Sequence, residues 1–310
     1  MQPSENIKLY CLENFFKELT YLYNDKKMPN KILLSGKKGL GKSTMAYHLV
    51  NFILSNEEEF QYNSDKMLIN KENKSYKLIQ NNSHPNFYPV DLFDEKKNID
   101  IAQIREMISY TNKSSFNKKP RLILIDNIEN LNISSVNALL KIVEEPNENI
   151  FFILIHNNEK SILSTLRSRC LTFKINLSFT KCIEVTNKLL GKNILDLINH
   201  ELFTNYNTPG DLINLLDFAN ERKINLKKYS LVEFLTLLID NSYYKKNKTI
   251  KDLLLNFIEL FFLKKYNITD NKNSVFNNYH EFLLKINKTN KFNLDYESLF
   301  LEFKSKILNG

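Results

Sequence analysis

Eight consecutive residues near the start of the sequence have the types and spacing of a phosphate-binding loop. Gly36 to Ser43 read G-K-K-G-L-G-K-S, a full match to G-x-x-x-x-G-K-[ST], and hold three of the six glycines among 310 residues. In such a loop, backbone N–H groups surround phosphate oxygens at a helix N-terminus, where unpaired donors and the helix dipole favour negative charge. The residues expected to contact ATP or ADP here are Gly36, Gly39, Gly41, Lys42, Ser43 and Thr44. Lys42 is expected to reach the β- and γ-phosphates and Ser43 to hold Mg²⁺. The alternative is a glycine-rich loop without a ligand.

Two polar residues farther along the chain are candidates for the same site. The apolar run from Arg121 closes on Asp126, a pattern in which the carboxylate orients the water shell of a nucleotide-bound Mg²⁺. A second apolar run, 150–155, is followed by His-Asn-Asn. Asn157 is therefore expected to lie level with Asp126, where it can touch a γ-phosphate or its attacking water. The plainer alternative is that Asn157 and Asn158 form a turn.

The hydrophobic pattern predicts the elements that position these residues. Strands are expected at 31–34, 86–90, 121–126 and 150–155, and helices at 44–50, at 100–111 with Asp100 as N-cap, and from Ser134 or Ser135 to Pro146. Such alternation favours an α/β domain with a mostly parallel sheet flanked by helices. The polar stretch 56–82 resembles an insertion or long loop. Beyond Leu216, apolar residues at helical spacing predict helices over 231–238, 253–263, 282–286 and 299–307. These patterns suggest a nucleotide-binding domain at 1–175, a small helical lid domain at 176–218 and an all-α domain at 219–310.

Composition limits the classes of function. Hydrophobic content of 43% and charged content of 25% are ordinary for a globular protein, and no segment resembles a signal peptide or a membrane span, so we expect a cytoplasmic protein. The net charge of +8 comes almost entirely from lysine, and a solvated lysine surface explains it better than a nucleic-acid patch. Three scattered cysteines indicate neither a disulfide framework nor a zinc site. Arginine is scarce, yet two of the five fall in one R-S-R triplet at 167–169.

Several motifs together resemble the clamp-loader AAA+ proteins of bacterial DNA polymerase III. They are the P-loop, Ser-His-Pro at 83–85, the strand to Asp126, N-A-L-L-K-I-V-E-E-P at 137–146 and S-R-C at 168–170. The resemblance implies an AAA+ domain, a lid and a helical collar in a hetero-pentamer with ATPase subunits and a delta subunit. That assembly loads a sliding clamp onto primer-template DNA during replication. Polymerase activity resides in the larger holoenzyme, and this chain would be an accessory subunit. The likeness also implies that Arg169 is an arginine finger, which contacts ATP on a neighbouring subunit. The alternative is that Arg169 only pairs with a local carboxylate.

Two departures from the family pattern predict weak hydrolysis by the chain itself. Active members resemble one another in carrying Asp-Glu at the end of the acidic strand, whereas here Asn127 follows Asp126. Gly210 stands where the family places a sensor arginine. A stator that supplies its finger to a neighbour fits this pattern. The alternative is a self-sufficient ATPase or nucleotide switch in which another residue, such as Glu129, positions water, although Glu129 needs an altered loop to reach the site.

Overall fold

The chain divides into two compact units. The structure is a computed structural model that describes residues 2–93, 96–113, 117–144, 149–245 and 248–308. The first unit spans Met1–Val185 and the second Thr186–Gly310, and helix α7 (Phe179–Leu190) contains the point of division. The finer division into three domains stays a prediction. No helix in the described part of the chain is long and apolar enough to cross a membrane.

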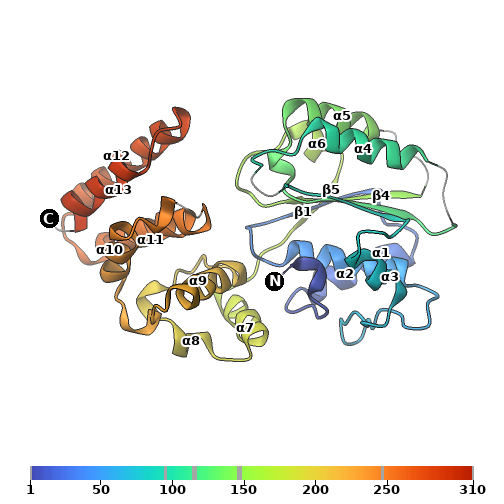
Figure 1. Cartoon of the computed structure of the whole chain (residues 1–310), viewed down its shortest axis with the longest axis horizontal. Helices are drawn as coiled ribbons and strands as arrows, with labels where there is room; N and C mark the ends of the chain where they lie inside the picture. Colours follow the sequence, from blue (N-terminus) through green and yellow to red (C-terminus); the bar gives the residue numbers. More distant parts are fainter. Residues whose placement is uncertain (1, 94–95, 114–116, 145–148, 246–247, 309–310) are drawn as a thin grey trace. The chain divides into compact units, whose positions relative to one another are not determined.

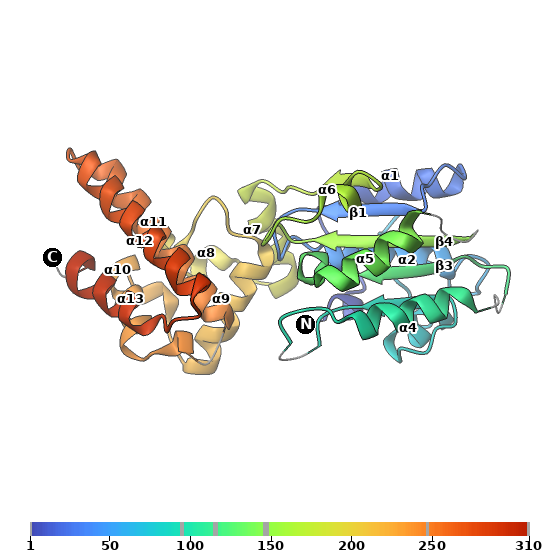
Figure 2. The same cartoon turned by 90° about the horizontal axis from the view of Figure 1, so that it is seen from above.

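The first unit is built on a five-stranded parallel sheet. Its strands are β1 (Lys31–Ser35), β2 (Phe87–Val90), β3 (Arg121–Ile125), β4 (Ile150–His156) and β5 (Leu171–Lys174). They are arranged in the order β2-β3-β4-β1-β5, and every neighbouring pair is parallel (Figure 2). The predicted α/β class is therefore confirmed. All carboxyl ends of the strands lie along one edge of the sheet, the edge at which ligands bind in open α/β sheets.

Helices cover both faces of this sheet. Helices α1 (Glu13–Asn24), α2 (Lys42–Leu54) and α3 (Lys74–Gln80) lie on one face, and α4 (Ile101–Asn112), α5 (Ile133–Glu144) and α6 (Ser164–Arg167) on the other (Figure 1). The central strands are buried from both sides: Leu33 belongs to the core under α4 and α5, and Leu34 to the core under α1 and α2. Each fully buried aliphatic side chain of this kind stabilises the fold by about 1.5–3 kcal/mol.

The starts of two helices differ in how well the sequence predicted them. Asp100 is the N-cap of α4, as expected, and its N–H donates to the Gln103 side chain at 3.0 Å. The predicted cap of α5 is wrong, because the Asn132 side chain accepts from the Ser135 N–H at 2.8 Å. The Ser135 hydroxyl is buried and instead donates to the Ile99 carbonyl at 3.0 Å. The Glu145 and Pro146 end of the predicted helix lies outside the described residues.

The polar stretch 56–82 is more ordered than its composition predicts. It contains α3, which begins where the buried Asn73 side chain accepts from the Tyr76 N–H at 2.7 Å. Tyr62 and Ile69, from the same stretch, join the core under α2. The expectation of a loop is therefore wrong for this part, because capping by Asn73 and a few buried side chains suffice to fix the chain.

The second unit is helical in the part that the structure describes. Its helices after α7 are α8 (Ile194–Leu197), α9 (Pro209–Arg222), α10 (Leu231–Asp240), α11 (Lys248–Ile268), α12 (Lys272–Lys291) and α13 (Glu297–Phe303). Short turns of 3-10 helix join them at η3 (His200–Leu202), η4 (Leu226–Lys228) and η5 (Tyr243–Lys245). The predicted C-terminal helices are confirmed, and Phe257 and Phe262 are core residues.

Candidate nucleotide-binding site

The phosphate-binding loop joins the carboxyl end of β1 to α2. Gly39 and Gly41 have φ of 81° and 84°, a left-handed conformation that glycine adopts without strain. Gly36 is required for a different reason, since a Cβ there would lie 2.3 Å from the Ile175 carbonyl oxygen. The structure thus places the P-loop in the strand, loop and helix context that phosphate binding requires.

Lys42 is held inside the loop. Its side chain is 2% exposed, and its ammonium donates to the Lys37 carbonyl at 2.7 Å. Burial lowers the pKa of Lys42 to about 8, although the carboxylates of Asp126 and Glu129 act in the opposite direction. A desolvated ammonium that bonds a loop carbonyl is suited to pair with an incoming phosphate.

Ser43 and Asp126 meet across the end of the sheet. The Ser43 hydroxyl donates to the Asp126 carboxylate. Burial, and next the nearby Asp91 carboxylate, raise the pKa of Asp126 to about 6. A hydroxyl and a carboxylate are oxygen ligands of the kind that Mg²⁺ takes. Among the described residues, no group of three or more His, Cys, Asp or Glu side chains could hold a metal. The pair therefore fits a Mg²⁺ that obtains its other ligands from phosphates and water, as nucleotide-bound Mg²⁺ does.

The residue after Ser43 is bonded to the amino-terminal segment. The Thr44 hydroxyl accepts from the Asn6 side-chain amide at 3.4 Å, which ties the start of α2 to the amino-terminal segment. Its predicted contact with the nucleotide stays a prediction.

Asn157 belongs to a chain of side chains along the carboxyl edge of the sheet. Its amide nitrogen donates to the Asn127 side-chain oxygen at 2.9 Å. The Asn127 amide nitrogen in turn donates to an Asp91 carboxylate oxygen at 2.6 Å. The residues that follow β2, β3 and β4 are thereby connected, and the predicted contact of Asn157 with a γ-phosphate or its attacking water stays a prediction. Asp91 was not among the residues predicted from the sequence, although it follows the apolar run of β2 directly.

Glu129 lies within the same network. It belongs to η2 (Ile128–Asn130), the turn after β3, and is 8% exposed. One carboxylate oxygen, Oε1, accepts from the Asn157 backbone N–H at 3.0 Å. The loop before it turns at Asn127, which adopts a left-handed conformation with φ 55° and ψ 44°. The role of Glu129 in positioning water stays a prediction.

Arg169 lies toward the opposite edge of the sheet. Leu171, two residues later, pairs with Ile32 near the start of β1, whereas the P-loop follows the other end of that strand. The four residues of β5 span roughly 13 Å at about 3.3 Å each. Arg169 forms an ion pair of 2.8 Å with Glu144 at the end of α5 and donates to the Thr165 carbonyl at 2.8 Å. The local pairing considered from sequence is therefore present, and the structure does not bring Arg169 to the P-loop of its own chain.

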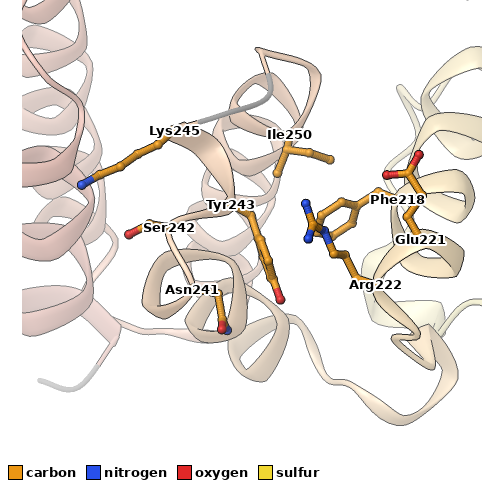
Figure 3. A pocket seen from close by; sticks show the side chains of 8 residues that line it. All are labelled: Phe218, Glu221, Arg222, Asn241, Ser242, Tyr243, Lys245 and Ile250. Carbon is orange, nitrogen blue, oxygen red and sulfur yellow. The ribbon is translucent and has the colours of Figure 1, made fainter.

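The second unit contains a cavity of about 390 Å³ that includes none of these residues. Figure 3 shows Phe218 and Arg222 on one wall and Tyr243 on the facing wall. The Arg222 guanidinium lies 5.2 Å from the centre of the Tyr243 ring, and the Phe218 and Tyr243 rings meet edge to face at 5.3 Å. Three of the residues that line this cavity, Phe218, Arg222 and Tyr243, thus contact one another.

Two solved structures align with most of this chain at low sequence identity. A DNA polymerase III gamma subunit-related protein of Thermotoga maritima aligns with 84% of this chain and 76% of its own, at 16% identity and a TM-score of 0.43. The RuvB Holliday junction branch migration motor of the same organism aligns with 87% of this chain and 76% of its own, at 14% identity and a TM-score of 0.40.

Relatives found by sequence are more similar to this chain, at 26–30% identity. The DNA polymerase III subunit delta' of Buchnera aphidicola from Schizaphis graminum is 30% identical over 218 residues, which cover 69% of this chain and 63% of the relative. The delta' subunit of Buchnera aphidicola from Baizongia pistaciae is 26% identical over 84% of this chain and 71% of its own. The gamma subunit from the Schizaphis graminum strain is 28% identical over 97% of this chain and 76% of its own. The matched region thus spans just under two thirds of the length of the first of these relatives.

The family model described as DNA polymerase III, delta subunit, matches residues 11–178, more than half of the chain. This match includes the P-loop, the acidic strand and the S-R-C triplet, and it confirms the resemblance to clamp-loader AAA+ proteins. The chain belongs to the DNA polymerase III delta subunit family and is similar to its delta' members.

Proposed function

We propose that this chain is a delta prime-like subunit of a DNA polymerase III clamp loader and acts as a stator. In that role it joins ATPase subunits and a delta subunit in a hetero-pentamer that places a sliding clamp on primer-template DNA. Its Arg169 stabilises the charge that develops on the phosphoryl group of ATP bound to a neighbouring subunit. Family membership supports the assembly, and the placement of Arg169 supports the stator role.

The position of Arg169 is the observation that carries this proposal. An arginine at the amino edge of the sheet is separated from the chain's own P-loop by about the length of β5, roughly 13 Å. Transition-state stabilisation requires a donor within hydrogen-bonding distance of the developing charge. Arg169 therefore acts on a nucleotide held by another subunit, and Glu144 holds its guanidinium at the surface meanwhile.

The chain's own P-loop supports nucleotide binding with slow turnover. Lys42, Ser43 and Asp126 are arranged to bind ATP or ADP with Mg²⁺, whose positive charge would neutralise the phosphates. Asn127, however, offers an amide where a base is needed, and both ends of that amide are already hydrogen-bonded. The second candidate function, an ATPase in its own right, is favoured by one observation, the buried Glu129 carboxylate beside Asn157.

Steady-state ATP hydrolysis by a reconstituted assembly tests the stator role. The chain is mixed with clamp-loader ATPase subunits, delta, clamp and primed DNA, as wild type, Arg169→Ala or the matched control Arg167→Ala. Arg167 belongs to the same triplet and is also exposed. We expect Arg169→Ala to lower DNA-stimulated turnover by about 10²-fold or more, and Arg167→Ala to change it little. Wild-type turnover in the Arg169→Ala assembly, or an equal loss with Arg167→Ala, would refute the role.

A further inference from the structure

The cavity in the second unit combines apolar walls with the size of a small-molecule site. Phe218 on α9 is 6% exposed and Ile250 on α11 is 2% exposed, and both line the cavity. The cavity volume of about 390 Å³ falls within the range of about 300–1,000 Å³ that is usual for such sites. Sites of this class have mostly apolar walls and a few placed polar groups. The walls of this cavity can therefore hold the apolar part of a ligand.

Arg222, in the last turn of α9, gives the cavity a positive charge that is not neutralised within the described chain. Its guanidinium lies over the Tyr243 ring, 5.2 Å from the ring centre, and forms no ion pair or hydrogen bond with any described residue. Stacking on an aromatic ring uses the face of the planar guanidinium and leaves the N–H groups at its edge free to donate. The Tyr243 ring thus orients a pair of donors whose geometry matches a carboxylate.

Neighbouring charges favour a ligand with a single negative charge. Lys245, the other cation among the described lining residues, pairs with Glu297 at 2.7 Å, and its side chain extends away from Arg222 (Figure 3). Glu221 also lines the cavity but forms no ion pair with Arg222, because adjacent residues of a helix do not face each other. A second negative charge on the ligand would therefore lie near Glu221 without a cation of its own.

The turn that carries Tyr243 is fixed before any ligand binds. The next residue, Tyr244, is 4% exposed, and its ring meets that of Phe300 edge to face at 4.7 Å between centres. The Lys245 N–H donates to the Ser242 carbonyl at 3.1 Å and closes the turn. A wall that is already ordered reduces the conformational entropy lost on binding.

We propose that this cavity binds a small organic acid that carries one carboxylate on an apolar group. The carboxylate accepts two hydrogen bonds from the edge of the Arg222 guanidinium, and the apolar group lies against Phe218 and Ile250. Tyr243 holds the guanidinium in position, and its hydroxyl, which has no hydrogen bond to any described residue, is a further donor on the same wall. The cavity and the P-loop belong to different units of the chain.

A ligand-observed NMR titration of the full chain with 3-phenylpropanoate tests the proposal. The neutral analogue 3-phenylpropanamide has the same apolar group without the charge, and benzylmalonate adds a second carboxylate. We expect the wild type to bind 3-phenylpropanoate with a Kd of about 1 mM or tighter. The amide and the dicarboxylate should each bind about tenfold more weakly.

Arg222→Met removes the charge and keeps an unbranched side chain. We expect it to bind 3-phenylpropanoate about tenfold more weakly than the wild type does. The matched control is Lys228→Met, which removes the same charge from an exposed position in η4 outside the cavity lining and should leave the affinity unchanged. Circular dichroism checks that both variants fold. If Arg222→Met does not fold, the comparison of acid and amide with the wild type still decides.

Four results would overturn the proposal. The first is the absence of saturable binding of 3-phenylpropanoate by the wild type at about 10 mM. The second is an equal affinity for the acid and the amide, and the third is an equal affinity for the acid and benzylmalonate. The fourth is an Arg222→Met affinity equal to that of the wild type, which would place the ligand elsewhere on the chain, the P-loop included.

Discussion

His48 gives the first unit a stability that depends on pH. The ring is fully buried in α2, where Nε2 lies 3.0 Å from the Asn6 carbonyl oxygen and Nδ1 lies 2.8 Å from the Tyr62 hydroxyl. Because a carbonyl only accepts, Nε2 must carry the proton, and Nδ1 of the neutral ring accepts from Tyr62. Burial lowers the pKa of His48 to about 4, from an ordinary value of 6.5.

The sign and size of the effect follow from proton linkage. Between pH 6.5 and pH 4 the unfolded chain binds a proton at His48 that the folded chain does not, so acidification favours unfolding. At about 1.4 kcal/mol per pH unit, the difference between the two pKa values corresponds to about 3 kcal/mol of unfolding free energy. The contribution is complete above pH 6.5 and is lost as the pH falls toward 4.

Chemical denaturation of the wild type and His48→Gln, from pH 7 to pH 4, measures this contribution. Circular dichroism is the suitable signal, since the chain has no tryptophan. We expect the wild type to be more stable than His48→Gln at pH 7. The difference between their unfolding free energies should narrow by about 3 kcal/mol by pH 4. The raised pKa of Asp126, about 6, favours the folded state as the pH falls. This effect is common to both proteins and does not change the difference between their unfolding free energies. A gap that stays constant over this range would show that His48 is not held neutral by burial.

Two further substitutions test the sheet and the Arg169 pair. Gly36→Ala should destabilise the first unit by about 3 kcal/mol or more in thermal denaturation, because its Cβ would overlap the Ile175 carbonyl. The matched control Gly191→Ala, at φ 65° with open space around it, should cost only about 1–2 kcal/mol, and equal losses would contradict the overlap. Glu144→Gln removes an exposed ion pair and should change stability by less than about 1 kcal/mol. Assembly turnover should then change by less than about tenfold, since Arg169 keeps its bond to the Thr165 carbonyl, and a loss as large as that of Arg169→Ala would contradict this.

The sheet was predictable wherever strands are buried on both faces. Runs such as Leu122 to Ile125 are apolar at every position because helices cover them above and below. Strand β5 was not predicted, because Phe173 is the only buried residue among its four. The α5 cap was wrong for a related reason: Ser135 has a cap-forming side chain, but tertiary packing against Ile99 uses its hydroxyl. Local propensity therefore failed where distant contacts decide.

The candidate site divides in the same way. The positions of the P-loop and Asp126 were predictable because each belongs to a motif of contiguous residues at fixed spacing. Glu129 was only an alternative in the sequence-based prediction. Its burial depends on the left-handed conformation of Asn127, which the spacing of residues does not reveal. The Arg169 pair with Glu144 joins residues far apart in the chain. Its specific partner could not be identified without the fold.

The two chemical features of the first unit are separable because they occupy opposite edges of one sheet. The nucleotide edge carries Lys42, Asp126 and Glu129, and the other edge carries Arg169 about one strand length away, roughly 13 Å. Sites this far apart that share no partners usually contribute independently to stability and binding. Under the proposed stator role, the amide at Asn127 therefore need not weaken the contribution of Arg169, and low turnover at one edge would be compatible with full function at the other. On this proposal, the chain can retain a nucleotide site of low activity while Arg169 acts on a neighbouring subunit.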